Sequence, residues 1–192
     1  MCAQLFQIEP MGVKTPKSLY FAYGSNMHPE QIQKRCAHPE RVAVASLDGY
    51  RLGFYGHNPV WDGGFETIVA APGERLWGVV YALTNSNWEC LDQWQDARMD
   101  GTGSHFHSPA EVVDVEGNRY ETLLYKYDVR GAVAPPSEGF LAYILEGARQ
   151  QNLPESYLQS LAAIPANPSS YAVPRSSAFK PFLGDPCESC ST

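Results

Sequence analysis

Short apolar and β-branched runs fill the first two thirds of the chain, and such runs predict β-strands. They span 18–23, 41–55, 65–71, 75–83, 110–115 and 119–129. Asp48-Gly49 inside the second run and Pro72-Gly73 after the third are turn signals, so we expect the strands to be broken at both places. Residues 116–118, Glu-Gly-Asn, predict a hairpin between the last two strands.

Four further segments have helical spacing or helix-end signals. They span 29–36, 87–96, 138–151 and a segment that starts at Pro154. Ser86 should cap the second of these helices, with Glu89 reaching back to it. Strands gathered in a block with helices between some of them do not alternate as in a doubly wound sheet. The pattern therefore predicts an α+β domain with a curled, partly closed sheet.

The two ends of the chain lack this periodicity. We expect a loose arm over residues 1–17 and an irregular strap in the tail, which is rich in Pro, Ser and Ala. No apolar run reaches the length of a signal peptide or a membrane span, so we expect neither export nor a membrane partner. The net charge of −7 argues against nucleic acid. Five scattered cysteines favour a reducing compartment, and we expect a cytoplasmic protein.

One strand ends in an unusual way. Residues 19–27 read LYFAYGSNM, an apolar run that stops at three small residues, Gly24, Ser25 and Asn26. Small residues between a strand and a helix would let backbone N–H groups point at one spot, with the positive end of the helix dipole behind them. Such a loop binds an anion. The alternative is that Gly24 only permits a positive φ and its neighbours only turn the chain.

The stretch resembles the Tyr-Gly-Ser-Asn signature of the γ-glutamyl cyclotransferase family. Later segments resemble that family in the same order, at 61–68, 72–73, 77–81, 91–92, 134–137, 147–148, 153–154 and Tyr157. The resemblance covers residues 18–168 and leaves 169–192 as the strap. It implies a small mixed β-barrel flanked by helices. It also implies an enzyme that converts a γ-glutamyl amine into 5-oxoproline and the free amine without a cofactor.

In this family the signature loop holds the carboxylate end of the small-molecule γ-glutamyl substrate. The resemblance implies substrate contacts from the strand and loop, at Tyr20, Phe21, Ala22, Tyr23, Gly24, Ser25 and Asn26. Two tyrosines of the family fall at Phe106 and Phe140, which can pack against a ligand but cannot donate a hydrogen bond.

The family's proton-carrying glutamate follows a Leu-Asp pair. Here an ungapped count from Leu91-Asp92 puts Gln95 at that position, and an amide cannot act as a base. One inserted residue puts Asp96 there, and we expect Asp96 to move the proton from the α-amino group to the departing amine. With Gln95 in the position, the chain would be a binding protein on the same scaffold. A third reading is an enzyme with changed chemistry on another small carboxylate amide.

Two other patterns receive weaker interpretations. His105 and His107 would share a face of an extended segment, but no third ligand is evident, so we predict no metal site. They could instead replace a missing tyrosine hydroxyl. Trp94 is the tryptophan expected to line the cavity, and the CESC motif at 187–190 receives no role. The sequence leaves the oligomeric state open, with a homodimer as one outcome.

Overall fold

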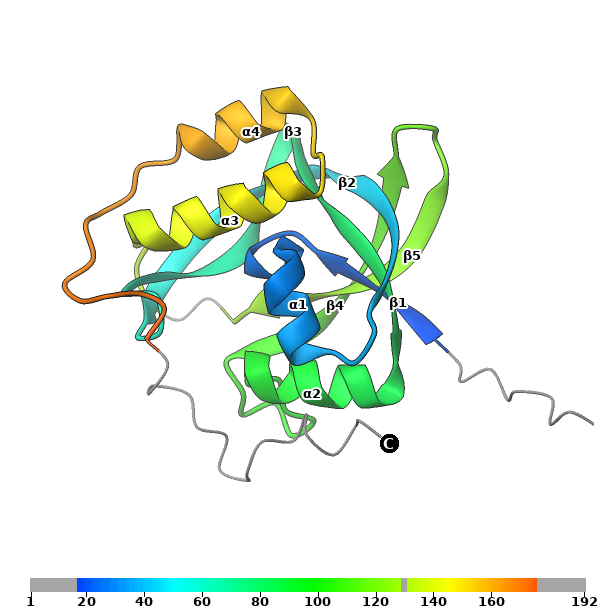
Figure 1. Ribbon diagram of the computed structural model, residues 1–192, viewed down its shortest axis with the longest axis horizontal. Helices are drawn as coiled ribbons and strands as arrows, with labels where there is room; N and C mark the ends of the chain where they lie inside the picture. The colour runs from blue at the N-terminus through cyan, green and yellow to red at the C-terminus, as the bar shows by residue number, and fades with distance from the viewer. Residues whose placement is uncertain (1–16, 129–130, 176–192) are drawn as a thin grey trace, which may run out of the picture.

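The computed structural model describes residues 17–128 and 131–175, which form a barrel of strands flanked by helices (Figure 1). The strands in this part of the chain are β1 Lys17–Ala22, β2 Glu40–Asn58, β3 Gly63–Thr84, β4 His105–Asp114 and β5 Arg119–Tyr127. The helices are the 3₁₀ turn η1 Ser25–Met27, α1 Pro29–Arg35, α2 Asn85–Gln95, α3 Glu138–Gln150 and α4 Glu155–Ala162.

The barrel closes in the order β1, β3, β2, β4, β5. The pair that closes the barrel, β1 and β5, is parallel at Tyr20 and Leu123. The pairs β1–β3, β2–β3, β2–β4 and β4–β5 are antiparallel. The predicted small mixed barrel is therefore confirmed. Closure removes the exposed edges that an open sheet of this size would present.

β2 and β3 form one long ladder, so the predicted strand breaks are wrong. Asp48 pairs with Arg75 and Tyr50 pairs with Ala70, which leaves residues 71–74 opposite Gly49 alone. Gly49 and Gly73 both have positive φ, as turn residues do. Because pairing continues on both sides, the chain absorbs these residues as a bulge rather than ending the strands.

The four predicted helices are present, but one cap differs from the prediction. Thr84, and not Ser86, caps α2: its side chain accepts a hydrogen bond from the backbone N–H of Asn87 at 3.3 Å. α2 thus begins two residues before the predicted start, because Thr84 ends β3 in the extended conformation that a cap requires.

α3 anchors the loop that follows β1. Its buried face includes Phe140, Ile144 and Ala148. Gly147 faces η1 so closely that an added Cβ would lie 2.7 Å from the backbone nitrogen of His28. Just beyond α3, the Gln151 amide donates to the Met27 carbonyl at 3.1 Å. The helix packs beside α4 on one side of the barrel and fixes the position of η1 (Figure 1).

Several expectations concern residues outside the described ranges. These are the N-terminal arm up to residue 16 and the tail from 176, including the CESC motif. Within the described part, Cys36 and Cys90 are buried and free of disulfides. No helix in the described ranges has the length and apolar character needed to cross a bilayer.

Val112→Ala should destabilise the barrel by about 2 kcal/mol, because it removes buried methyl groups and leaves a cavity. Val112 on β4 is fully buried, whereas Val115 in the following turn is 77% exposed. The matched control Val115→Ala should change stability by less than about 0.5 kcal/mol. Urea unfolding of both variants measures the difference, and equal losses would contradict the packing described here.

Candidate active site

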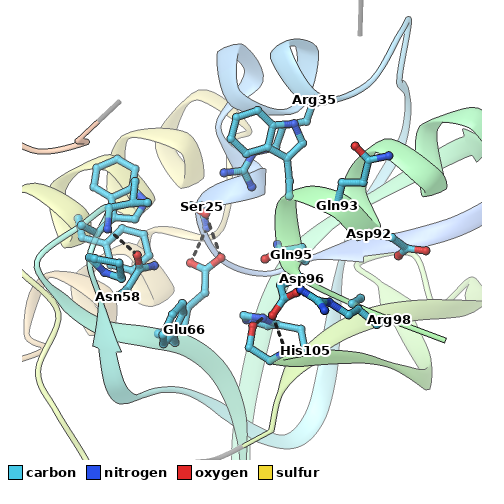
Figure 2. A pocket seen from close by; sticks show the side chains of 18 residues that line it. Ser25, Arg35, Asn58, Glu66, Asp92, Gln93, Gln95, Asp96, Arg98 and His105 are labelled. Atoms are coloured by element: carbon cyan, nitrogen blue, oxygen red, sulfur yellow. Dashed lines mark hydrogen bonds and ion pairs between the residues drawn. The ribbon is translucent and has the colours of Figure 1, made fainter. Parts of the chain in front are cut away.

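A cavity of about 720 Å³ opens at one end of the barrel, beside η1 and the end of α2. Residues of η1, α1, β3, β4 and α3 line it. The β2–β3 connection, the end of α2 and the loop after α2 also contribute lining residues. Its polar lining includes Ser25, Arg35, Asn58, Glu66, Asp92, Gln93, Gln95, Asp96, Arg98, Ser104 and His105. Figure 2 shows these side chains converging from elements far apart in sequence.

Glu66 on β3 lies against the loop after β1 (Figure 2). Its carboxylate accepts hydrogen bonds from the Ser25 backbone N–H at 2.8 Å and from the Ser25 hydroxyl at 2.9 Å. A Cβ added to Gly24 would lie 2.2 Å from Oε2 of Glu66. Gly24 has φ of −126°, so a positive φ does not explain this glycine. The close approach of the carboxylate explains it.

The electrostatics of Glu66 combine opposing influences. Burial raises the pKa of the Glu66 carboxyl, because the charged form loses solvation. The two hydrogen bonds from Ser25 and the charge of Arg35 lower that pKa, but burial is the larger effect. Glu66 is therefore a carboxyl that releases its proton less readily than usual and still has a cation nearby.

Arg35, the last residue of α1, supplies that cation. Its Nη1 donates to Oδ1 of Asn26 at 2.8 Å, and its guanidinium lies 5.0 Å from the centre of the Trp94 ring. The Asn26 amide also donates to the Tyr20 hydroxyl at 2.9 Å. Asn26 is buried and holds Arg35 and Tyr20 in place, while Arg35 itself lines the cavity.

A small recess continues the cavity toward Gly24. It is lined by Tyr20, Tyr23, Gly24, Glu66, Gln95, His105 and Tyr125. Glu66, Gln95 and His105 line both spaces. Of the residues expected to contact substrate, Phe21 and Ala22 instead lie fully buried in the core.

Gln95 and Asp96 have different surroundings although they are neighbours. Gln95 ends α2 and lines the recess beside Gly24. Asp96 is the C-cap, with φ of 48°, and its carboxylate accepts from Arg98 Nε at 2.8 Å and from the Ser104 backbone N–H at 3.0 Å. Asp96 lines the wider cavity but not the recess, and it lies beside Arg98 in Figure 2.

The two predicted phenylalanines also differ. Phe140 is buried, lines the cavity and stacks on Trp61 with ring centres 4.7 Å apart. Phe106 is 45% exposed and lies outside the cavity lining. Its neighbour His105 lines the cavity, and burial lowers the pKa of His105 to about 4, so its imidazole is neutral near pH 7.

The remaining predictions concern metals and aromatic lining. His107 Nε2 lies 2.6 Å from the Asp92 carboxylate rather than beside His105 in a ligand set. The part of the chain that the structure describes holds no group of three or more His, Cys, Asp or Glu that could bind a metal. Trp94 lines the cavity as expected, and so does Trp61.

Sequence reasoning missed Glu66 and Arg35. Glu66 is the only charged residue in the run 63–71, and an isolated charge inside a barrel strand was the available signal. Arg35 gave no such signal, because a cation at the end of a helix is ordinary.

Comparisons with known proteins agree with this fold. A model of the AIG2-like family matches residues 75–161. The chain is 33% identical over 156 residues to gamma-glutamylcyclotransferase of Homo sapiens, covering 78% of this chain and 79% of that protein. The Bos taurus protein of the same name is 34% identical over 157 residues, with the same coverage. A solved gamma-glutamyl cyclotransferase superposes with a TM-score of 0.74 at 31% identity, covering 82% of this chain and 93% of that one. The chain belongs to the γ-glutamylcyclotransferase family.

Gly24→Ala should lower the free energy of unfolding by about 1–3 kcal/mol, because the added Cβ would push the Glu66 carboxylate off Ser25. The loss should shrink in a Glu66→Ala background, where no carboxylate meets the new methyl group. A double-mutant cycle by urea unfolding measures this coupling. Equal losses in the two backgrounds would show that Gly24 is needed for another reason.

Glu66→Gln should stabilise the protein at neutral pH, since it removes a carboxylate that burial disfavours. The pKa of Glu66 in the folded state lies above its ordinary value of 4.5, so the folded protein binds this proton more tightly than the unfolded chain does. Stability of the unaltered protein therefore falls as pH rises between the two values. Thermal unfolding as a function of pH should show the variant's advantage vanishing below about pH 4, where the unaltered side chain is also neutral. Parallel curves would contradict the raised pKa.

Proposed function

We propose that this protein cyclises γ-glutamyl amides, releasing 5-oxoproline and a free amine. Its relatives bear the name of that activity. The observation that carries the proposal is one cavity that holds both a cation, Arg35, and a partly buried carboxyl, Glu66, next to the loop of Gly24 and Ser25. These are the charges that complement an α-amino acid end.

The α-amino acid end of a γ-glutamyl group carries an ammonium and a carboxylate. We assign the carboxylate to Arg35, because a guanidinium presents paired donors that suit two carboxylate oxygens. The Ser25 N–H, the donor expected to hold the substrate carboxylate, already bonds to Glu66. The ammonium then lies near Glu66, at the other end of the head group.

The chemistry requires movement of protons and little else. The α-ammonium loses two protons in the course of forming the lactam N–H, and its nitrogen bonds to the γ-carbonyl carbon. The bond from that carbon to the amine nitrogen breaks, and the departing amine gains two protons and leaves as an ammonium. Nucleophile and carbonyl belong to one molecule, so the protein chiefly folds the substrate and shuttles protons. The reaction as written balances in atoms and charge without a cofactor.

The amine half of the substrate should be bulky and largely apolar. Away from the charged groups, the cavity is lined by Pro59, Val60, Trp61, Phe65 and Phe140. Its volume exceeds what a γ-glutamyl group alone fills, and aromatic walls favour an aromatic or branched apolar group.

Incubation with a panel of γ-glutamyl amines, followed by mass spectrometry for 5-oxoproline, tests the function. We expect product, with kcat/KM at least about tenfold higher for an aromatic amine such as γ-glutamyl-tryptophan than for γ-glutamyl-glycine. Binding of these compounds without any product would favour a binding protein on the same scaffold. Equal rates across the panel would contradict the apolar assignment of the amine half.

We also propose a cytoplasmic location for the protein. The buried thiols of Cys36 and Cys90 support a reducing compartment. The homodimer stays a prediction from the sequence.

A further inference from the structure

We infer that Glu66 on β3, rather than an acid at the end of α2, is the catalytic residue that carries protons in the cyclisation. This inference rests on the proposed function and names the residue that performs it. Glu66 would touch the α-nitrogen of the substrate and later the departing nitrogen.

The geometry supports a catalytic acid that comes from β3 instead of from α2. Glu66 and Gln95 line the same recess beside Gly24, although one comes from β3 and the other from α2. An ungapped count puts Gln95 where the family resemblance implies the acid. A carboxylate from the facing strand therefore reaches the space that a glutamate at position 95 would serve.

The neutral amide at position 95 is consistent with this placement of the acid. Two carboxylates in one small recess would repel each other, and one of them would take up a proton. Gln95 has nearly the shape of glutamate but no charge, so it fills the helix position without disturbing Glu66. It also offers an N–H donor to the recess.

The other acids of the cavity are already engaged elsewhere. Asp96 bonds to Arg98 and to the Ser104 backbone. Asp92 accepts from the Tyr125 hydroxyl at 2.5 Å and lies 2.6 Å from His107. Among the acids in the described residues, Glu66 is the one that lines both the cavity and the recess at Gly24.

Glu66 is also held in a fixed orientation with capacity to spare. A carboxylate offers about four acceptor sites, and Ser25 uses one on each oxygen. The remaining sites can accept from a substrate ammonium. Because burial raises the pKa of Glu66, its protonated form is more accessible near neutral pH, which suits a group that must accept and return a proton.

Each turnover leaves Glu66 as it began. Its carboxylate takes a proton from the α-ammonium, the freed amine attacks the γ-carbonyl carbon, and the proton then passes to the nitrogen of the departing amine as its bond to carbon breaks. The second proton of the attacking nitrogen follows the same route. No oxidant or second reactant is needed.

The test compares two acids in the γ-glutamyl assay. Glu66→Gln should lower kcat by at least about 100-fold, the contribution expected of one proton-carrying group. Asp96→Asn should lower kcat by less than about tenfold, since it only weakens the contacts of this side chain with Arg98 and the Ser104 backbone. Glu121→Gln makes the same chemical change on an exposed face of β5 and serves as the matched control. Thermal unfolding verifies that each variant is folded.

Restoring the helix acid completes the test. Glu66→Gln combined with Gln95→Glu should recover kcat at least tenfold over Glu66→Gln alone, on the order expected for a partly misplaced proton carrier. In the single variant Gln95→Glu, two carboxylates share the recess, so the acidic limb of the pH–rate profile should move to higher pH.

The outcomes separate two kinds of failure. Product from the unaltered enzyme together with near-normal kcat in Glu66→Gln would overturn this inference and leave the proposed function standing. A double variant no faster than Glu66→Gln would contradict the shared recess. No product from the unaltered protein on any γ-glutamyl amine would overturn the proposed function and the inference together.

Discussion

The pairing of the Glu66 carboxylate with the backbone and hydroxyl of Ser25 is the contact on which the site depends. A carboxyl group taken out of water needs donors, and a backbone N–H at a strand end is one of the few that the fold can bring to it. Gly24 must then lack a side chain, because a Cβ would overlap the carboxylate. In this chain, one partly buried carboxylate thus constrains both Gly24 and Ser25.

Rigid elements hold both partners of this contact. Glu66 lies on β3, in the longest ladder of the closed barrel, and Ser25 begins the turn that α3 and Gln151 hold from the other side. A group on a barrel strand is positioned more firmly than one at a helix end followed by a loop. Moving the acid from α2 to β3 would therefore free the segment after Gln95 to lengthen and change. Asp96 and the glycine-rich stretch behind it occupy that segment.

Much of the fold was predictable from local patterns. The apolar runs located the strands, and the helical spacing of apolar residues over 138–151 located α3. Both patterns arise because burial within an element selects apolar side chains. The breaks predicted at Asp48-Gly49 and Pro72-Gly73 were wrong, since turn residues fit equally well into a bulge when pairing resumes beyond them. The cap of α2 was wrong because Thr84 and Ser86 carry the same capping chemistry, and only the end of β3 selects between them.

The sequence by itself determined the family, the small-residue loop after β1 and the ambiguity between Gln95 and Asp96. It could not decide which acid reaches that loop, because Glu66 lies about 40 positions from Ser25 and their meeting depends on strand order and register. Arg35 lies only nine positions from Asn26 and was missed for a different reason, since a cation at a helix end is ordinary and its place beside the cavity follows from how α1 packs. Local patterns report burial within an element, whereas a catalytic pocket depends on which elements face one another, and only the closed barrel specifies that.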